Sequence, residues 1–117
     1  MEIKGEASLL RIFVSSSDKF KHNPLYEMIV FAAKRSGLAG VTVIKGFMGY
    51  GANSAVHSVS AWDLSDKSPV VIEIVDEMEK IDRFIEKILP WFEKLRHGYM
   101  ITVEKANILV YRKNIKK

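Results

Sequence analysis

The chain has 117 residues, of which 48% are hydrophobic and 27% charged, and its formal net charge is +4 at pH 7. This length suits a single domain spanning 1–117, and the absence of cysteine excludes disulfides, thiolate catalysis and cysteine-based zinc sites. No apolar run is long enough to cross a bilayer and no secretory leader is visible, so we expect a cytoplasmic protein without membrane insertion.

The first expected elements are a strand over 7–14 and a helix that follows it. In the strand ASLLRIFV, apolar residues occupy both alternating faces, which indicates burial on both sides. Asn23 followed by Pro24 is typical of a helix N-cap with proline at the first helical position, and Gly37 is typical of the C-terminal end. Between them, apolar residues recur at helical spacing: Leu25, Ile29, Ala32 and Ala33.

A glycine-rich strand and a loop come next. The segment VTVIKGFMGY, over 41–50, predicts one long strand that Gly46 and Gly49 weaken. Residues 51–68 have no sustained period and many small polar side chains, which predicts an exposed loop. We expect 52–66 to be the most mobile internal segment.

The second half predicts a strand, a helix and a terminal strand. The strand PVVIEIV precedes Asp76 and Glu79, which form a D-x-x-E capping signature ahead of an amphipathic helix. Pro90 is expected to end or kink that helix, because proline lacks a backbone donor and clashes with the preceding turn. Residues 100–111 predict one broken strand, or two short strands, around 106–107.

This order predicts an α+β fold, the ferredoxin-like βαββαβ sandwich, with a four-stranded antiparallel sheet and two helices on one face. The other face then needs a cover, because burying each large apolar side chain there stabilises the fold by roughly 1.5–3 kcal/mol. The residues expected on this open face are Leu9, Phe13, Val71 and Val75. We therefore expect a closed homo-oligomer in which the open faces meet.

Composition and motifs argue against nucleic acid and catalysis. The basic residues are spread among acids, and Lys45–Tyr50 imitates an RNA-recognition octamer on the second strand instead of the third, so no nucleic acid is expected. No nucleophile elbow or catalytic dyad is present, so no enzyme is expected. The three histidines lack metal-ligand spacing, and only His57, in the loop, is a candidate ligand-touching group. Glutamine is absent, a composition that resembles thermophile proteins.

The segment GLAGVTVIKGFMGYGANSAVHS, followed by LSDKSPVVIEIVDEMEKI, resembles an uncharacterised PII-like family in its glycines, its loop histidine and its acidic helix start. The resemblance is strong from Pro24 to about Ile85. More distantly, the chain is similar to the nitrogen-regulatory PII signalling proteins, which carry "GITGMTV" and "KGFG" at the corresponding strand. The resemblance implies a PII-like homotrimer with its three sheets facing inward, in agreement with the apolar open face.

In PII proteins, adenine nucleotides bind between subunits, against the base of the signalling loop that follows the second strand. The resemblance therefore implies a nucleotide effector, AMP or ADP, and no obligatory cofactor. The implied nucleotide-binding residues are Gly40, Val41, Thr42, Lys45, Gly46, Phe47, Gly98 and Arg112. The implied signalling-loop residues are Gly49, Gly51, Asn53 and His57. An unknown protein partner is expected to bind the loop 51–68.

The chain departs from the PII pattern at positions that bind the nucleotide's phosphates in PII proteins. PII proteins have an Arg-Gln pair where this chain has Met48 and Gly49, and a lysine where it has Tyr99. Two phosphate-binding residues are missing, so we expect AMP or ADP to be preferred over ATP. One alternative is a metal-ion-binding tolerance protein of the same trimeric architecture, using His57 and Asp63. Another is a small acylphosphatase-like hydrolase, which needs an arginine after the first strand where this chain offers a lysine.

Overall fold

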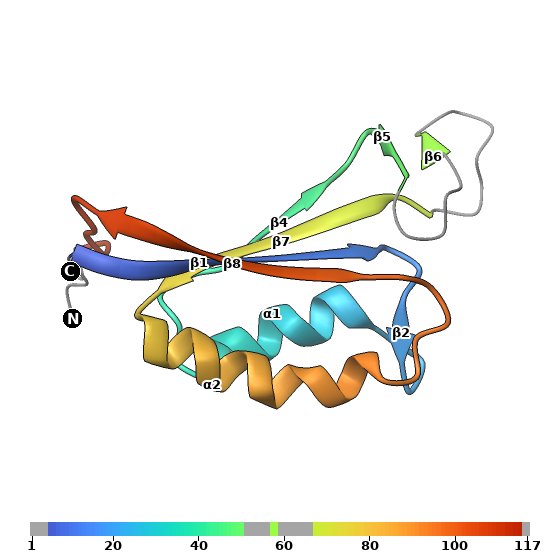
Figure 1. Cartoon of the computed structure of the whole chain (residues 1–117), viewed down its shortest axis with the longest axis horizontal. Coiled ribbons are helices and arrows are strands. Elements are labelled where there is room, and N and C mark those ends of the chain that lie inside the picture. The colour runs from blue at the N-terminus through green and yellow to red at the C-terminus, as the bar shows by residue number, and fades with distance from the viewer. Residues whose placement is uncertain (1–4, 51–56, 59–66, 116–117) are drawn as a thin grey trace.

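A computed structural model describes residues 5–50, 57–58 and 67–115. Its central feature is a four-stranded antiparallel sheet, in the order β4-β7-β1-β8, with both helices against one face (Figure 1). The strands are β1 (Gly5–Ser15), β4 (Thr42–Lys45), β7 (Pro69–Asp76) and β8 (Met100–Ile108). The helices are α1 (Leu25–Arg35) and α2 (Met78–Ile88). The predicted ferredoxin-like α+β arrangement is confirmed.

The core lies between the sheet and the two helices. Alternate residues face the helices and are buried from Ser8 to Val14 of β1 and from Val70 to Asp76 of β7, because side chains alternate between the two faces of a strand. The helical spacing predicted for the first helix is confirmed, since all four of its predicted apolar residues are buried. The main core residues are Leu10, Ile12, Val14, Leu25, Ile29, Ile72, Ile74, Ile81, Phe84, Ile88 and Phe92.

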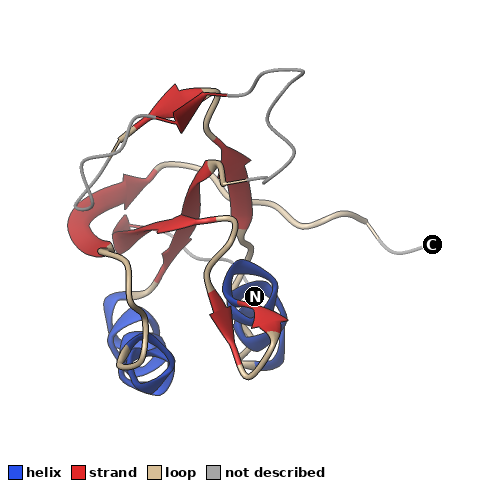
Figure 2. Ribbon diagram, turned by 90° about the vertical axis from the view of Figure 1, so that its right-hand side faces the viewer, coloured by secondary structure: helices blue, strands red, loops and turns tan. Residues whose placement is uncertain are grey.

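The open face carries the apolar residues that were expected there. Leu9 pairs with Val75, and Phe13 pairs with Val71, so these four side chains share one face of the sheet. All four are only half-buried in the single chain. Figure 2 shows both helices on the opposite side of the sheet. The prediction of an apolar open face is confirmed.

The prediction of one long strand over 41–50 is wrong. The strand β4 ends at Lys45, and β5 (Met48–Gly49) pairs instead with β6 (His57–Ser58) in a separate two-stranded sheet that rises above the open face (Figure 1). The break follows from a close approach at Gly46, whose N–H donates to the Pro69 carbonyl at 2.6 Å. A Cβ at Gly46 would lie 2.7 Å from Pro69 Cγ, so only glycine fits there.

The predicted cap of the first helix is also wrong. Asn23 lies in β3 (Asn23–Pro24), which pairs with β2 (Lys19–Phe20), and its side-chain amide donates to the Lys21 carbonyl. The first helical N–H, that of Leu25, donates to the Asp18 carbonyl at 2.9 Å, so backbone replaces the expected side-chain cap. At the other end, Gly37 has φ +76°, as the predicted C-terminal glycine requires.

Asp76 does not form the predicted capping box with Glu79. The N-cap of α2 is Glu77, without a side-chain hydrogen bond, and Asp76 is the fully buried last residue of β7. Its carboxylate accepts hydrogen bonds from the N–H groups of Glu77 (2.7 Å) and Ala39 (2.8 Å). The carboxylate therefore joins the end of β7 to the loop before β4, 37 residues away in sequence.

The two remaining predictions concern Pro90 and the last strand. The helix α2 ends at Ile88 and a 3-10 turn, η1 (Leu89–Phe92), follows, so the prediction that Pro90 ends the helix is confirmed. The predicted break at 106–107 is wrong, because β8 pairs with β1 without interruption from Met100 to Ile108. The strand also stops at Ile108, short of the predicted residue 111.

Candidate functional site

A cavity of about 470 Å³ lies on the open face at the start of β4. We call it the β4 cavity. Three of the predicted nucleotide-binding residues, Gly40, Val41 and Thr42, line one side of it. The rest of its lining includes Glu73 and Val75 of β7, Leu9 of β1, and the C-terminal Val110 and Tyr111. This volume lies within the range of small-molecule sites.

Two contacts hold the loop that forms the β4 cavity. Asp76 accepts the Ala39 N–H, and the Tyr111 hydroxyl donates to the Ala39 carbonyl at 3.4 Å. The second contact requires the chain to cross the sheet after β8, because β8 and β4 are its opposite edges. Arg112 follows Tyr111 directly and is exposed. No sequence signal predicts this crossing, which brings the C-terminal segment beside Gly40.

The charges beside the β4 cavity come from three strands. Arg11 binds Glu73 through Nε at 2.9 Å and Glu104 through Nη1 at 2.8 Å. The pKa of Arg11 is raised above its ordinary value, first by the hydrogen bond to Glu73 and next by that to Glu104. With two carboxylates for one guanidinium, this side of the cavity favours ligand groups that donate hydrogen bonds and disfavours phosphate.

A second cavity, of about 540 Å³, lies at the other end of the open face, between the root of the central loop and the segment before β8. We call it the loop-root cavity. Of the predicted residues, Gly98 and Gly49 line it. Lys67, His97 and Tyr99 also line it, and none of them was predicted as a binding residue. The Tyr99 ring packs on Phe92, with centroids 4.8 Å apart.

The remaining predicted residues lie outside both cavities. Lys45 and Phe47 are exposed, and Gly46 packs against the proline that opens β7. His57 is described only as a backbone partner of Gly49 in the β5–β6 pair. Gly51 and Asn53 lie outside the described residues, as does most of the segment 52–66 predicted to be mobile.

The two cavities lie at opposite ends of β7. The β4 cavity includes Val75 and the loop-root cavity includes Pro69, six residues earlier. At about 3.4 Å per residue, Val75 and Pro69 are roughly 20 Å apart, although the nearest lining residues of the two cavities, Glu73 and Val71, are only two residues apart. A small ligand in one chain therefore contacts Gly40–Thr42 or Gly98, and not both.

Residues 5–50, 57–58 and 67–115 contain no group of three or more histidine and acidic side chains that could hold a metal ion. Asp63, named for the metal alternative, lies outside these ranges, and the His57 side chain is not described. Neither helix in this part of the chain is long and apolar enough to cross a membrane.

Comparisons with known proteins agree with the fold. The family model of DUF190, described as "Uncharacterized ACR", matches residues 7–108. A UPF0166 protein of Aquifex aeolicus is 39% identical over 101 residues, which cover 86% of this chain and 91% of that protein. The solved structure of CPII, a nitrogen regulatory PII-like protein from Thiomonas intermedia K12 bound to ADP, AMP and bicarbonate, is similar with a TM-score of 0.65, 18% identity and 88% of each chain covered. A putative PII-like signaling protein from Thermus thermophilus gives a TM-score of 0.62 at 19% identity, covering 90% of this chain and 91% of that one. The fold is PII-like.

Proposed function

Because the chain belongs to the DUF190 family, whose model spans most of its length, we propose that it is a PII-like sensor without catalytic activity. It forms a homotrimer, binds an adenine nucleotide between subunits, and signals the bound state to a protein partner through the loop 51–68. The observation that carries this proposal is the β4 cavity, in which Gly40, Val41 and Thr42 lie beside Leu9 and Val75 on the open face of the sheet. That CPII of similar fold is bound to ADP and AMP supports the choice of ligand.

The β4 cavity suits the base and ribose of a nucleotide. Leu9 and Val75, neighbours on the open face, can cover one face of a flat ring, while the backbone of Gly40–Thr42 can hydrogen-bond to a ring edge. No side chain stands in the way at Gly40, because a Cβ there would meet nothing within 4 Å. The Glu73 carboxylate can accept hydrogen bonds from amino or hydroxyl groups.

The charges of Glu73 and Arg112 determine how a nucleotide is oriented in the cavity. The Glu73 carboxylate lines the cavity and disfavours a phosphate beside it, whereas Arg112 follows Tyr111 on the C-terminal side. A nucleotide therefore binds with its base toward the sheet and its phosphates toward Arg112, where a charge-assisted hydrogen bond stabilises the complex by roughly 1.5–3 kcal/mol.

The two cavities support a nucleotide site between subunits. Within a chain, Val75 beside Gly40 and Pro69 beside Gly98 are roughly 20 Å apart, so one small ligand does not contact both ends. When open faces meet in an assembly, the β4 cavity of one chain can adjoin the loop-root cavity of the next. The second chain then supplies Gly98 and Lys67 to the phosphate end. The half-buried Leu9, Phe13, Val71 and Val75 provide the apolar contact for such an assembly.

The number of phosphates is limited by the available cations. Met48, Gly49 and Tyr99 replace residues that reach phosphate in PII proteins, and the Tyr99 ring is packed on Phe92. Losing two charged contacts costs about 3–6 kcal/mol for the outer phosphates. Arg112, with Lys67 from the adjoining chain, suits one or two phosphates, so AMP or ADP binds more tightly than ATP.

Isothermal titration calorimetry with AMP, ADP and ATP tests the proposal. We expect AMP or ADP to bind about a hundredfold more tightly than ATP, since 3 kcal/mol corresponds to more than that factor. Arg112→Ala should weaken binding at least tenfold, and the neighbouring Lys113→Ala serves as the matched control. Gly40→Leu should abolish binding without unfolding the protein, because the space beside Gly40 is open.

Four outcomes would contradict the proposal. Tighter binding of ATP, or an unaffected Arg112→Ala variant, would overturn the phosphate assignment. Unchanged binding by Gly40→Leu would remove the β4 cavity from the site. Heat from divalent metal ions with none from any nucleotide would favour the metal-ion tolerance alternative.

A further inference from the structure

The hairpin β2–β3 carries an unusual turn. Its two tip residues, Lys21 and His22, have φ of +49° and +69°, the left-handed region that non-glycine residues rarely adopt. Two-residue hairpin turns with both φ values positive normally use Asn-Gly or Gly-Gly. Strained conformations of this kind persist where the surrounding structure fixes them, and they cluster at binding and switch sites.

The body of the protein holds this hairpin in place. The nearly buried Asp18 accepts the Ser15 N–H at 2.9 Å and its carbonyl accepts the Leu25 N–H, so both ends of the hairpin are fixed. The Phe20 ring lies 6.3 Å from the Trp91 ring of η1, and Lys21 Nζ lies 5.3 Å from the centre of the Phe20 ring. These aromatic contacts therefore hold the turn in a fixed position on the protein surface.

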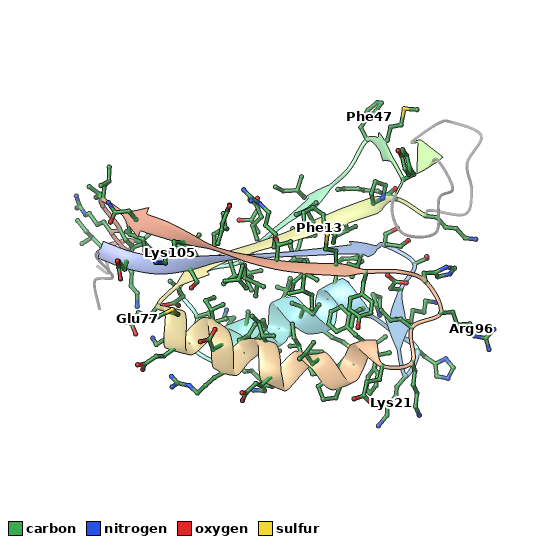
Figure 3. The ribbon with its side chains drawn as sticks, viewed as in Figure 1. Phe13, Lys21, Phe47, Glu77, Arg96 and Lys105 are labelled. Carbon is green, nitrogen blue, oxygen red and sulfur yellow. The ribbon has the colours of Figure 1, made fainter. Side chains whose placement is uncertain are left out.

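Positive charge gathers around this turn. The Phe20–Trp91 contact brings the hairpin beside the segment that follows η1, and Figure 3 shows Lys21 and Arg96 at the same end of the molecule. The segments 19–23 and 93–97 contain four lysine or arginine residues and one acid, Glu93. We call the four residues the cationic end: Lys19, Lys21, Lys94 and Arg96. All four are exposed, and none forms an ion pair within the described part of the chain.

We propose that the cationic end binds an acidic segment of a protein partner, a short run of aspartate or glutamate side chains. Exposed cations without intramolecular carboxylate partners attract carboxylates, and the fixed hairpin reduces the entropy lost when they are engaged. This surface requires neither a trimer nor a nucleotide, so it goes beyond the sensor function proposed above.

A protein fits this end better than a nucleic acid does. Binding to a nucleic-acid backbone draws its affinity from phosphates neutralised by lysine or arginine, and the cationic end offers only four such charges. Phe20 and Trp91, both half-buried, lie beside the turn and offer partly exposed aromatic surface. Aromatic residues are enriched in the contact surfaces of proteins.

Fluorescence anisotropy with a labelled decamer of glutamate tests the proposal on the full-length protein at low salt. We expect binding that weakens as salt rises, because exposed charges are screened. The double variant Lys21→Glu/Arg96→Glu should bind at least about tenfold more weakly. The matched control is Lys105→Glu/Lys113→Glu, which removes the same charge from the opposite end, where Figure 3 shows Lys105. This control should retain the wild-type affinity within about twofold.

Circular dichroism melts of both double variants show whether they remain folded. A third variant, Lys94→Glu, leaves the strained turn untouched and should also bind the peptide more weakly. Equal losses in the two double variants would mean that only net charge matters, and would overturn the proposal. Absence of binding at low salt would also overturn it. A ten-nucleotide single-stranded oligonucleotide that binds more tightly than the peptide would identify the surface as one for nucleic acid.

Discussion

The substitution Asp76→Asn tests how the candidate site is held. Asp76 is fully buried, and its two carboxylate oxygens accept the N–H groups of Ala39 and Glu77 at 2.8 and 2.7 Å. Asparagine has nearly the same shape but keeps only one acceptor oxygen, and its amide nitrogen would face one of these N–H donors. One charge-assisted hydrogen bond is lost, which costs roughly 1.5–3 kcal/mol of unfolding free energy.

Urea denaturation monitored by tryptophan fluorescence measures this loss. The midpoint should fall without a change in slope, because the variant alters stability and not the surface exposed on unfolding. Asp82→Asn, at an exposed position of α2, is the matched control and should change stability by less than about 0.5 kcal/mol. If Asp76→Asn is as stable as the control, Asp76 does not hold the loop before β4, and Gly40 must be positioned by other contacts.

Three further substitutions test separate parts of the structure. Gly46→Ala should lower the free energy of unfolding by about 1–3 kcal/mol in urea denaturation, since the new Cβ would lie 2.7 Å from a proline carbon. The control Gly40→Ala should leave the stability unchanged, and equal stability of the two variants would contradict the close approach at Gly46. Lys21→Asn/His22→Gly should stabilise the protein by about 1–2 kcal/mol by relieving the left-handed turn, and a lower melting temperature would refute that strain. Phe13→Asp should convert the proposed oligomer to a monomer in light scattering, and an unchanged mass would exclude the open face as the interface.

The arrangement of the main elements could be predicted because it rests on local patterns. Alternating and helical spacing of apolar residues identified β1, β7 and α1, and the resulting order left one topology that agrees with right-handed crossovers. The break after β4 could not be predicted, because it depends on contact between Gly46 and Pro69, which lie 23 residues apart. The sequence shows that residue 46 is glycine, but it does not show that the Pro69 side chain leaves no room for a Cβ there.

The candidate site was predictable only in its first segment. The resemblance identified Gly40, Val41 and Thr42, which do line one cavity. Their neighbours Glu73 and Tyr111 were missed, because one faces the cavity through strand pairing and the other reaches it by a crossing after β8. The role of Asp76 was missed for a similar reason. A buried carboxylate that bridges distant segments looks, in sequence, like any acid before a helix.

Native mass spectrometry with increasing ADP tests the intersubunit nucleotide site most directly, because one spectrum reports both the number of chains and the number of bound nucleotides. We predict a trimer of about 40 kDa, three times the 13.3 kDa chain, that takes up as many as three ADP molecules. Arg112→Ala should keep the trimer and lose the nucleotide at the same concentration. A monomer that binds ADP would contradict the intersubunit site, and a trimer that binds no adenine nucleotide would contradict the proposed function.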